Sequence, residues 1–106
     1  MVKAAAMRKR YVLFELGGPD MQEEELKRGL YAEALRFFGE FGMSEAAFKL
    51  LEYDLKTKRG IIRCERSYLE KVLGFLALIS SLDGKPARVR GLKSSGTIAS
   101  LKPTNP

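Results

Sequence analysis

The sequence contains no histidine, no tryptophan and only one cysteine in 106 residues. Without histidine the chain has no Ser-His or Cys-His nucleophile pair, no histidine general base and no histidine-containing metal site. A single cysteine also excludes a disulfide within the chain and a multi-cysteine zinc site. Because Cys64 has apolar neighbours in GIIRCER, we expect a small buried side chain there and not a reactive thiol.

Long hydrophobic runs are also missing, since none approaches the roughly 20 residues that cross a bilayer. The start, MVKAAAMRKR, has small apolar residues before its basic cluster, the reverse of the order in a signal peptide. We therefore expect a cytoplasmic protein with no membrane contact. The length fits one domain, which we place at 10–102, after a basic N-terminal extension (1–9) and before a C-terminal tail (103–106).

The positive charge, +6 overall, is concentrated in the second half of the chain. Residues 55–106 hold eleven basic and three acidic side chains, a net charge of +8, whereas residues 21–54 hold four basic and eight acidic ones, a net charge of −4. This uneven distribution is typical of a protein that turns one surface towards a polyanion, and it favours nucleic acid as the partner.

Strand and helix signals follow one another in the order β-α-β-β-α-β. The expected elements are a strand at 10–16, a helix from Asp20 to Gly42, a hairpin within 48–65 preceded by a helical turn at 44–47, a helix from 67 to about 83 and a strand at 85–93. Ser67 and Glu70 have the spacing of a capping box at the start of the second helix. The order predicts an α+β ferredoxin-like or RRM-like sandwich, with a four-stranded antiparallel sheet and helices on one face.

The second helix has more apolar surface than one sheet can cover. Its apolar arc is about 220° wide, against the 100° or somewhat more that a sheet-packed helix needs. A protein partner, the first helix or the tail could cover the surplus. The residues we assign to partner binding are Tyr68, Phe75, Leu78 and Leu82.

Basic residues cluster on the hairpin turn and the last two strands. An RRM stacks bases on aromatic side chains of its central strands, but here Ile61, Arg63 and Glu65 stand at the signature positions of the third strand. Tyr11 on the first strand could still stack a base, but a lone exposed tyrosine is more often an ordinary surface residue, so we expect little single-strand base readout through the sheet face. Contact with phosphates remains, aided by the SSGT segment, which could form a backbone nest for an anion. The predicted RNA-binding residues are Lys56, Lys58, Arg59, Arg63, Arg66, Arg88, Arg90, Lys93, Ser95 and Thr97.

An enzymatic function finds little support in the residues. Small acyl phosphate hydrolases of this size and element order use an asparagine to orient water, and the one asparagine here, Asn105, lies in the terminal tail. Glu52 and Asp54 share a strand face and could bind Mg²⁺, but an ion pair with Arg63 across the hairpin is the better explanation. We therefore predict no catalytic and no metal-binding residues.

Three motifs in order, GIIRC at 60–64, ALISSLDGK at 77–85 and SGTI at 95–98, join RYVLFEL at 10–16. Together they resemble the archaeal ribonuclease P protein component 2 family, also found as a eukaryotic subunit of ribonucleases P and MRP. The resemblance spans residues 10–102. Within residues 21–47 the match lies mainly in the sequence pattern and not in individual residues.

The resemblance implies an RRM-like fold in a ribonucleoprotein that removes the 5′ leader of precursor tRNA. In that family the RNA subunit catalyses cleavage with Mg²⁺, so the protein is expected to hold no cofactor and to meet precursor tRNA only indirectly. The implied partners are ribonuclease P RNA and ribonuclease P protein component 3, commonly two copies of each protein. The alternative hypothesis is a ferredoxin-like protein-interaction or ligand-sensing module with an incidental basic surface.

Overall fold

A computed structural model describes residues 8–102 of the chain. The predicted N-terminal extension lies outside these residues except for Arg8 and Lys9, and Lys9 is already part of the first strand; the tail at 103–106 lies wholly outside them. The elements are β1 (Lys9–Gly17), α1 (Glu23–Ala46), β2 (Lys49–Asp54), β3 (Arg59–Glu65), η1 (Arg66–Tyr68), α2 (Leu69–Leu78), β4 (Ser81–Leu82), β5 (Lys85–Pro86), β6 (Arg88–Ser95) and η2 (Ala99–Leu101).

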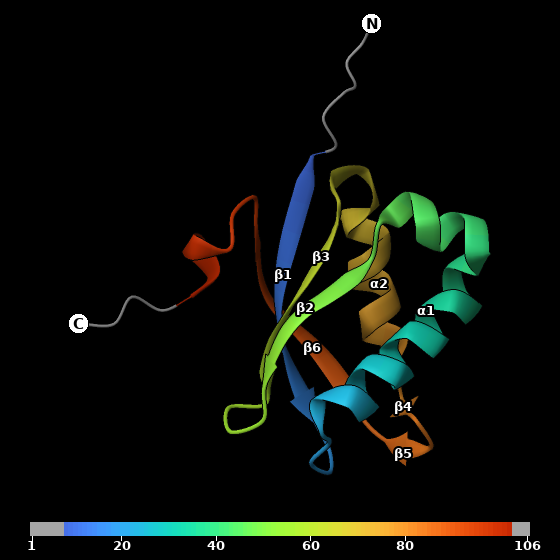
Figure 1. Cartoon of the computed structure of the whole chain (residues 1–106), viewed down its shortest axis with the longest axis vertical. Coiled ribbons are helices and arrows are strands. Elements are labelled where there is room, and N and C mark those ends of the chain that lie inside the picture. Colours follow the sequence, from blue (N-terminus) through green and yellow to red (C-terminus); the bar gives the residue numbers. More distant parts are fainter. Residues whose placement is uncertain (1–7, 103–106) are drawn as a thin grey trace, which may run out of the picture.

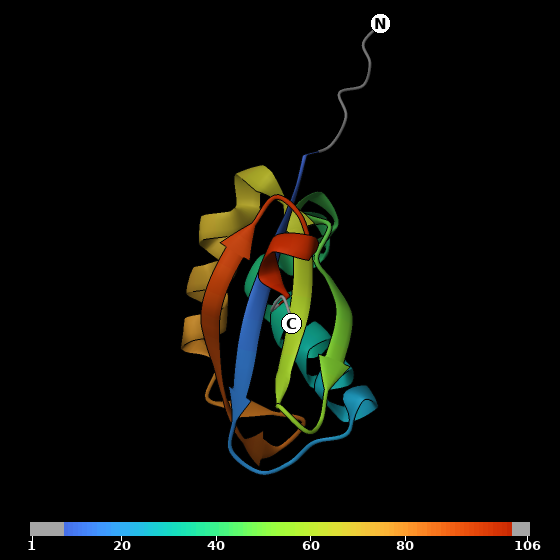
Figure 2. The same ribbon diagram turned by 90° about the vertical axis from the view of Figure 1, so that its left-hand side faces the viewer.

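The predicted sandwich is confirmed. A four-stranded antiparallel sheet has the order β2-β3-β1-β6, and both α-helices cover one of its faces (Figure 1). Within residues 8–102, the helix on the other face is the short η2, which lies in front of β1 and β3 when the sheet is viewed from that side (Figure 2). We call this second face the open face of the sheet.

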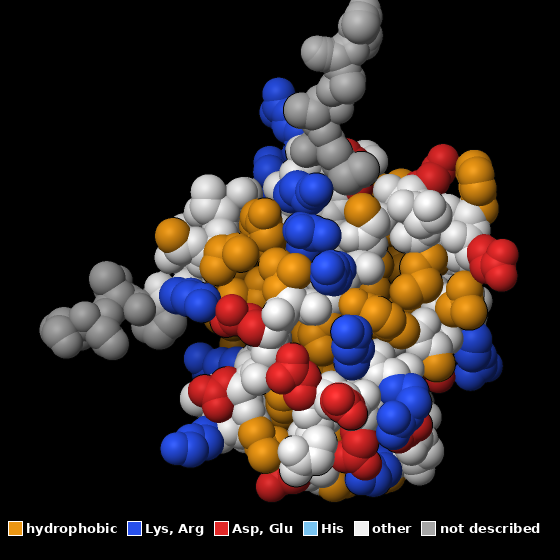
Figure 3. Space-filling view, in the orientation of Figure 1, with side chains coloured by type: hydrophobic (Ala, Val, Ile, Leu, Met, Phe, Trp, Pro, Cys, Tyr) orange, Lys and Arg blue, Asp and Glu red, His pale blue; other side chains and the backbone are white. Residues whose placement is uncertain are grey.

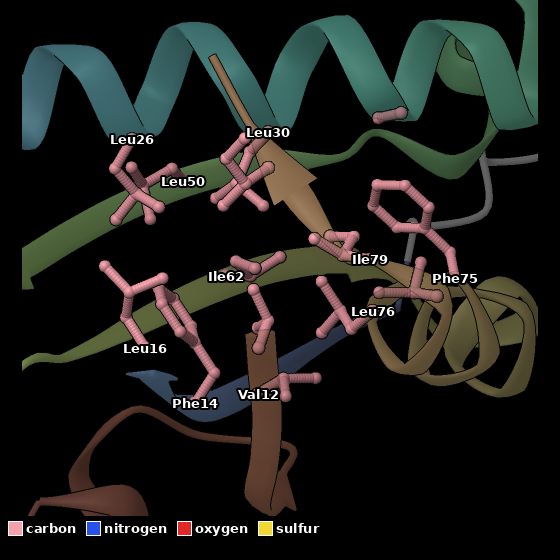
Figure 4. Packing of buried hydrophobic residues seen from close by; sticks show 14 of the residues in the cluster. Val12, Phe14, Leu16, Leu26, Leu30, Leu50, Ile62, Phe75, Leu76 and Ile79 are labelled. Carbon is pink, nitrogen blue, oxygen red and sulfur yellow. The ribbon is translucent and has the colours of Figure 1, made fainter. Parts of the chain in front are cut away.

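Alternation along the strands builds the core between the sheet and the helices. Val12, Phe14 and Leu16 point from β1 towards the helices and are buried, as the sequence predicts. Figure 4 shows these side chains below Leu26 and Leu30 of α1, and it places the α2 residues Phe75 and Leu76 at the side of the same core. Cys64 is fully buried among them, and burial raises the pKa of its thiol to about 11.

Helix α1 is longer than the sequence suggests. It runs past the predicted end at Gly42 to Ala46, and thus contains the separately predicted turn at 44–47. Gly39, with φ 77°, interrupts the helical backbone, while Gly42 does not. Ala47 ends the helix in the left-handed conformation, and its N–H bonds the carbonyls of Met43 and Ser44 at 3.1 Å.

The second helix is shorter than predicted and is capped differently. α2 ends at Leu78, and the capping box expected from Ser67 and Glu70 does not form. Glu65 caps η1 instead, because its carboxylate accepts a hydrogen bond from the Ser67 N–H at 2.8 Å.

The chain after α2 forms a small hairpin, β4–β5, where the sequence pattern predicts a continued helix. Asp83 and Gly84 make its two-residue turn with φ values of 51° and 80°, a conformation for which the Asp-Gly pair is a strong signal. The last strand of the main sheet therefore begins at Arg88, after the residue 85 predicted from the sequence.

Candidate nucleic-acid interface

The basic residues of β6 lie on the open face of the sheet. Arg88, Arg90 and Lys93 stand opposite Gly17, Glu15 and Leu13 of β1, and a register shift between Leu13 and Phe14 keeps Lys93 on that face. Val89, between the two arginines, is buried on the helix side. The prediction that Arg88 and Arg90 share one face is confirmed.

One end of the open face lies beside the β1–α1 loop, at the bottom of Figure 1, and we call it the lower end. Two of the predicted RNA-binding arginines are paired with an acid there. The Glu15 carboxylate accepts a hydrogen bond from Arg90 Nη2 at 2.8 Å and lies 3.6 Å from Arg59 Nε. The hydrogen bond from Arg90, with the charge of Arg59, holds the pKa of Glu15 below its usual range. The lower end therefore attracts a polyanion less than its arginines alone would.

The β2–β3 turn also uses one of its cations within the chain. Lys58 Nζ donates to the Gly18 carbonyl at 2.6 Å and lies 3.3 Å from Asp20 Oδ1, which ties this turn to the β1–α1 loop. Lys56, two residues earlier, is exposed and forms no side-chain ion pair within the described part of the chain.

The SSGT segment orders the return of the chain over the sheet. The hydroxyls of Ser95 and Ser100 are hydrogen-bonded, and Thr97 Oγ1 lies 3.1 Å from Ser100 Oγ. The Thr97 N–H, which an anion nest would need, donates to Ser95 Oγ at 3.2 Å. Lys93 Nζ donates to the Ser100 carbonyl at 3.0 Å. These polar groups thus hold η2 in place, and the Thr97 N–H is engaged within the segment itself.

Helix η2 closes the middle of the open face. Leu101 is only 4% exposed and lines a shared pocket with Leu13 and Ile61 of the sheet. Lys102 anchors the segment through an ion pair with Glu52 at 3.1 Å. The sequence predicts an ion pair between Glu52 and Arg63, but Glu52 pairs with Lys102 instead.

The opposite, upper end of the sheet, where β1 begins in Figure 1, is strongly basic. The β1–β3 pairing and the bond from the Arg66 N–H to the Arg8 carbonyl at 2.7 Å bring several cations together there. We call them the basic end of the sheet: Arg8, Lys9, Arg10, Lys49, Arg63 and Arg66. Figure 3 shows Lys and Arg side chains gathered over this end, whereas acidic and basic side chains alternate lower down. Glu65, the acid opposite Lys9, is engaged in capping η1.

Of the predicted RNA-binding residues, only Arg63 and Arg66 belong to the basic end. Sequence reasoning missed Lys49 because it lies in the acidic segment 21–54, and it assigned Arg8 and Lys9 to an extension outside the domain. The signal was present in the register, since Lys49 stands opposite Arg63, but strand pairing cannot be read from charge counts.

On the helix side, exposed apolar residues line a groove between α1 and α2. The groove has a volume of about 250 Å³. Its lining consists of two exposed apolar residues, two buried ones and two charged ones: Phe37 and Leu78, Phe75 and Ile79, and Glu33 and Arg36. Leu78 is 71% exposed, and on α1 Phe37 and Phe41 are 47% and 78% exposed. This surface is the best candidate for contact with a protein.

The residues predicted to bind a partner have different surroundings. Leu78 is exposed, but Phe75 and Leu82 are buried in the core of the chain itself, because the hairpin after α2 turns Leu82 inwards. Tyr68 is half-buried, and its hydroxyl donates to Glu45 Oε1 at 2.7 Å. The chain's own core thus covers much of the apolar surplus inferred from the sequence.

Residues 8–102 contain no cluster of three His, Cys, Asp or Glu side chains that could hold a metal ion. Glu52 and Asp54 face the same side, but Glu52 pairs with Lys102, and Asp54 Oδ1 accepts the Lys56 N–H at 2.9 Å. No helix in the described part of the chain is long and apolar enough to span a membrane.

The fold and the charge distribution define an RRM-like sandwich with one basic end. The model of the Rpp14/Pop5 family matches residues 10–104, and the chain belongs to this family. It is 39% identical to ribonuclease P protein component 2 of Pyrococcus abyssi, over 88% of this chain and 80% of that protein. With the component 2 of Methanocaldococcus jannaschii it shares 34% identity, over 90% of this chain and 70% of the relative.

A chain in the cryo-EM structure of yeast ribonuclease MRP has a similar fold. The two structures superpose with a TM-score of 0.70 and 19% sequence identity, over 97% of this chain and 82% of the yeast chain. At this identity the similarity concerns the fold.

Proposed function

We propose that the chain is a non-catalytic protein subunit of ribonuclease P that binds and supports the catalytic RNA in removing the 5′ leader of precursor tRNA. Its membership of the Rpp14/Pop5 family, with relatives named ribonuclease P protein component 2, is the observation that carries the proposal. Mg²⁺ is held by the RNA and not by the protein, and precursor tRNA is met only through the complex.

The basic end of the sheet is the RNA-binding surface in this proposal. Its cations come from β1, β2, β3, η1 and Arg8 just before β1, and within residues 8–102 none of them forms an ion pair with an acid. Such cations reduce repulsion between neighbouring phosphates, so that the RNA can adopt its cleaving fold.

Reconstitution with the RNA and ribonuclease P protein component 3 tests this assignment. A Lys49→Ala/Arg63→Ala variant should slow precursor-tRNA cleavage, and the matched control Lys27→Ala, an exposed cation near the start of α1, should not. The logarithm of the RNA-binding constant decreases with the logarithm of the salt concentration. This decrease should become less steep, by roughly 0.7–0.9 for each phosphate that the variant no longer neutralises. Unchanged cleavage by the double variant would remove the basic end as the RNA surface, and a flat salt response of the wild type would favour the protein-interaction alternative.

Component 3 is the protein partner in this proposal, in an assembly with two copies of each. The groove between α1 and α2 is the surface we assign to it, because exposed apolar residues on both helices meet there. A pull-down with component 3 should lose capture with Leu78→Ser, while Leu55→Ser, an exposed leucine in the β2–β3 turn, leaves it unchanged. Equal capture of both variants would exclude this groove.

A further inference from the structure

We propose that the basic end of the sheet binds an unpaired nucleotide, with its base stacked on Tyr11 and the adjoining phosphates held by Arg63 and Lys49. The inference rests on the proposed function, since it takes RNA binding as given and specifies which kind of nucleotide this surface recognises.

Strand register places the three side chains in one row across the open face. Tyr11 stands opposite Arg63 of β3, and Arg63 stands opposite Lys49 of β2. Directly opposed residues on one face of an antiparallel sheet have Cβ atoms about 5 Å apart, so an aromatic surface and two cations lie side by side. On the other side of Tyr11 the row ends with Ser95 of β6, so it contains no acid.

Arg63 lies in the middle of the row and carries a buried donor that no described residue satisfies. Its guanidinium makes no hydrogen bond or ion pair with another side chain in residues 8–102, and its Nε is a buried donor without a partner. Buried donors are nearly always satisfied in folded proteins, and an arginine fork matches the oxygens of a phosphate. An RNA phosphate would supply the acceptors that the protein does not.

Tyr11 is placed to contact a base because no other aromatic side chain of the described strands lies on the open face. Leu101 covers the next row, formed by Leu13 and Ile61. Phe14 and Tyr53 stack on each other on the helix side, with ring centroids 6.3 Å apart, so Tyr11 is the aromatic residue that the described sheet strands present on this face. A base can stack on such a ring only when it is unpaired, which selects a loop, bulge or single strand over a duplex.

The lack of tryptophan in the sequence allows a direct test. A Tyr11→Trp variant carries a single tryptophan on the open face, and a stacked base should quench its fluorescence. The probe is a short single-stranded RNA, and the comparison ligand is an abasic strand of the same length with the same phosphates. We expect quenching by the RNA only. The control Phe41→Trp, 78% exposed on α1, should remain unquenched by both.

Affinities of a second pair of variants give an independent readout. Tyr11→Leu should weaken binding of the single-stranded RNA about five- to tenfold, while Tyr11→Phe, which keeps the ring, should bind almost as the wild type does. Both variants should bind the abasic strand as the wild type does, and thermal melting verifies that both are folded.

The outcomes separate this inference from the proposed function. If RNA binds with a normal salt dependence but Tyr11→Trp is not quenched and Tyr11→Leu binds normally, base stacking at Tyr11 is wrong and the proposed function stands. If neither the RNA subunit nor the single-stranded RNA binds the wild type, the proposed function itself fails.

Discussion

Arg28 on α1 and Asp83 in the β4–β5 turn are joined by two hydrogen bonds, from Nε to Oδ1 at 3.3 Å and from Nη2 to Oδ2 at 2.9 Å. A paired contact of this kind fixes orientation as well as distance. It fastens the short hairpin after α2 to the first helix, next to the buried side chain of Leu82.

The Arg28–Asp83 pair predicts a pH-dependent contribution to stability. The hydrogen bond from Arg28 lowers the pKa of Asp83, so the folded state binds this proton less readily than the unfolded state. The stabilisation is therefore present above the ordinary aspartate pKa of about 4 and is lost as the pH falls through the lower folded value. Asp83→Asn, which keeps the side-chain shape and tolerates the positive φ, should lower the melting temperature slightly at neutral pH.

Melting curves of wild type and Asp83→Asn from pH 7 down to about pH 2 would measure this contribution, because most aspartates are protonated at the lower limit. The two melting temperatures should converge in acid. A difference that persists at low pH would mean that the side chain acts through something other than its charge.

Gly60 is expected to be essential for packing in the centre of the sheet. A Cβ at this position would lie 2.6 Å from the Glu52 carbonyl oxygen and 2.7 Å from Cζ of Phe14. Gly60→Ala should therefore destabilise the protein by about 1–3 kcal/mol in urea unfolding, as overpacked cores do. In the matched control Gly74→Ala on α2, the added Cβ meets no atom within 4 Å, and it should be neutral or stabilise by up to about 1 kcal/mol.

Cys64 should be protected from thiol reagents in the folded protein. Its side chain is fully buried, and burial raises the thiol pKa to about 11, so little thiolate exists at pH 8. Alkylation should become fast only where urea unfolds the chain, and its rate should follow the unfolded fraction. Rapid labelling without denaturant would show that β3 opens locally.

Leu101 should contribute to stability although it lies in the final short helix. Leu101→Ser should cost about 1.5–3 kcal/mol in urea unfolding, the value of burying a leucine side chain, because it detaches η2 from Leu13 and Ile61. Lys102→Ala removes only a surface ion pair and should change stability by less than about 1 kcal/mol. Equal effects of the two changes would argue that charge, and not burial, holds this segment.

The element order could be predicted from the sequence because each strand carries its own local signal. The aromatic and β-branched run of β1 ends at two glycines and a proline, and Ile61-Ile62 follows a glycine-containing turn. The hairpin after α2 was missed since its apolar residues continue the helical spacing, although Asp83-Gly84 carried the turn signal.

The candidate site could be predicted only in part, because it depends on contacts between distant residues. Arg59 and Arg90 look like free cations in the sequence, yet Glu15 lies between them in the sheet. Lys49 belongs to an acidic stretch of sequence but stands beside Arg63 in space. Charge counts along the chain cannot detect such pairs, since register and bulges decide which side chains meet.

The position of β1 has a consequence for how the chain is made. Of the described strands, the first to be synthesised is β1, a central strand that needs β3 on one side and β6 on the other. Its second edge stays unpaired until residues 88–95 have been synthesised. The sheet therefore closes after translation has passed β6, and until then the nascent chain exposes an aromatic, β-branched strand edge that must be kept from pairing with other chains.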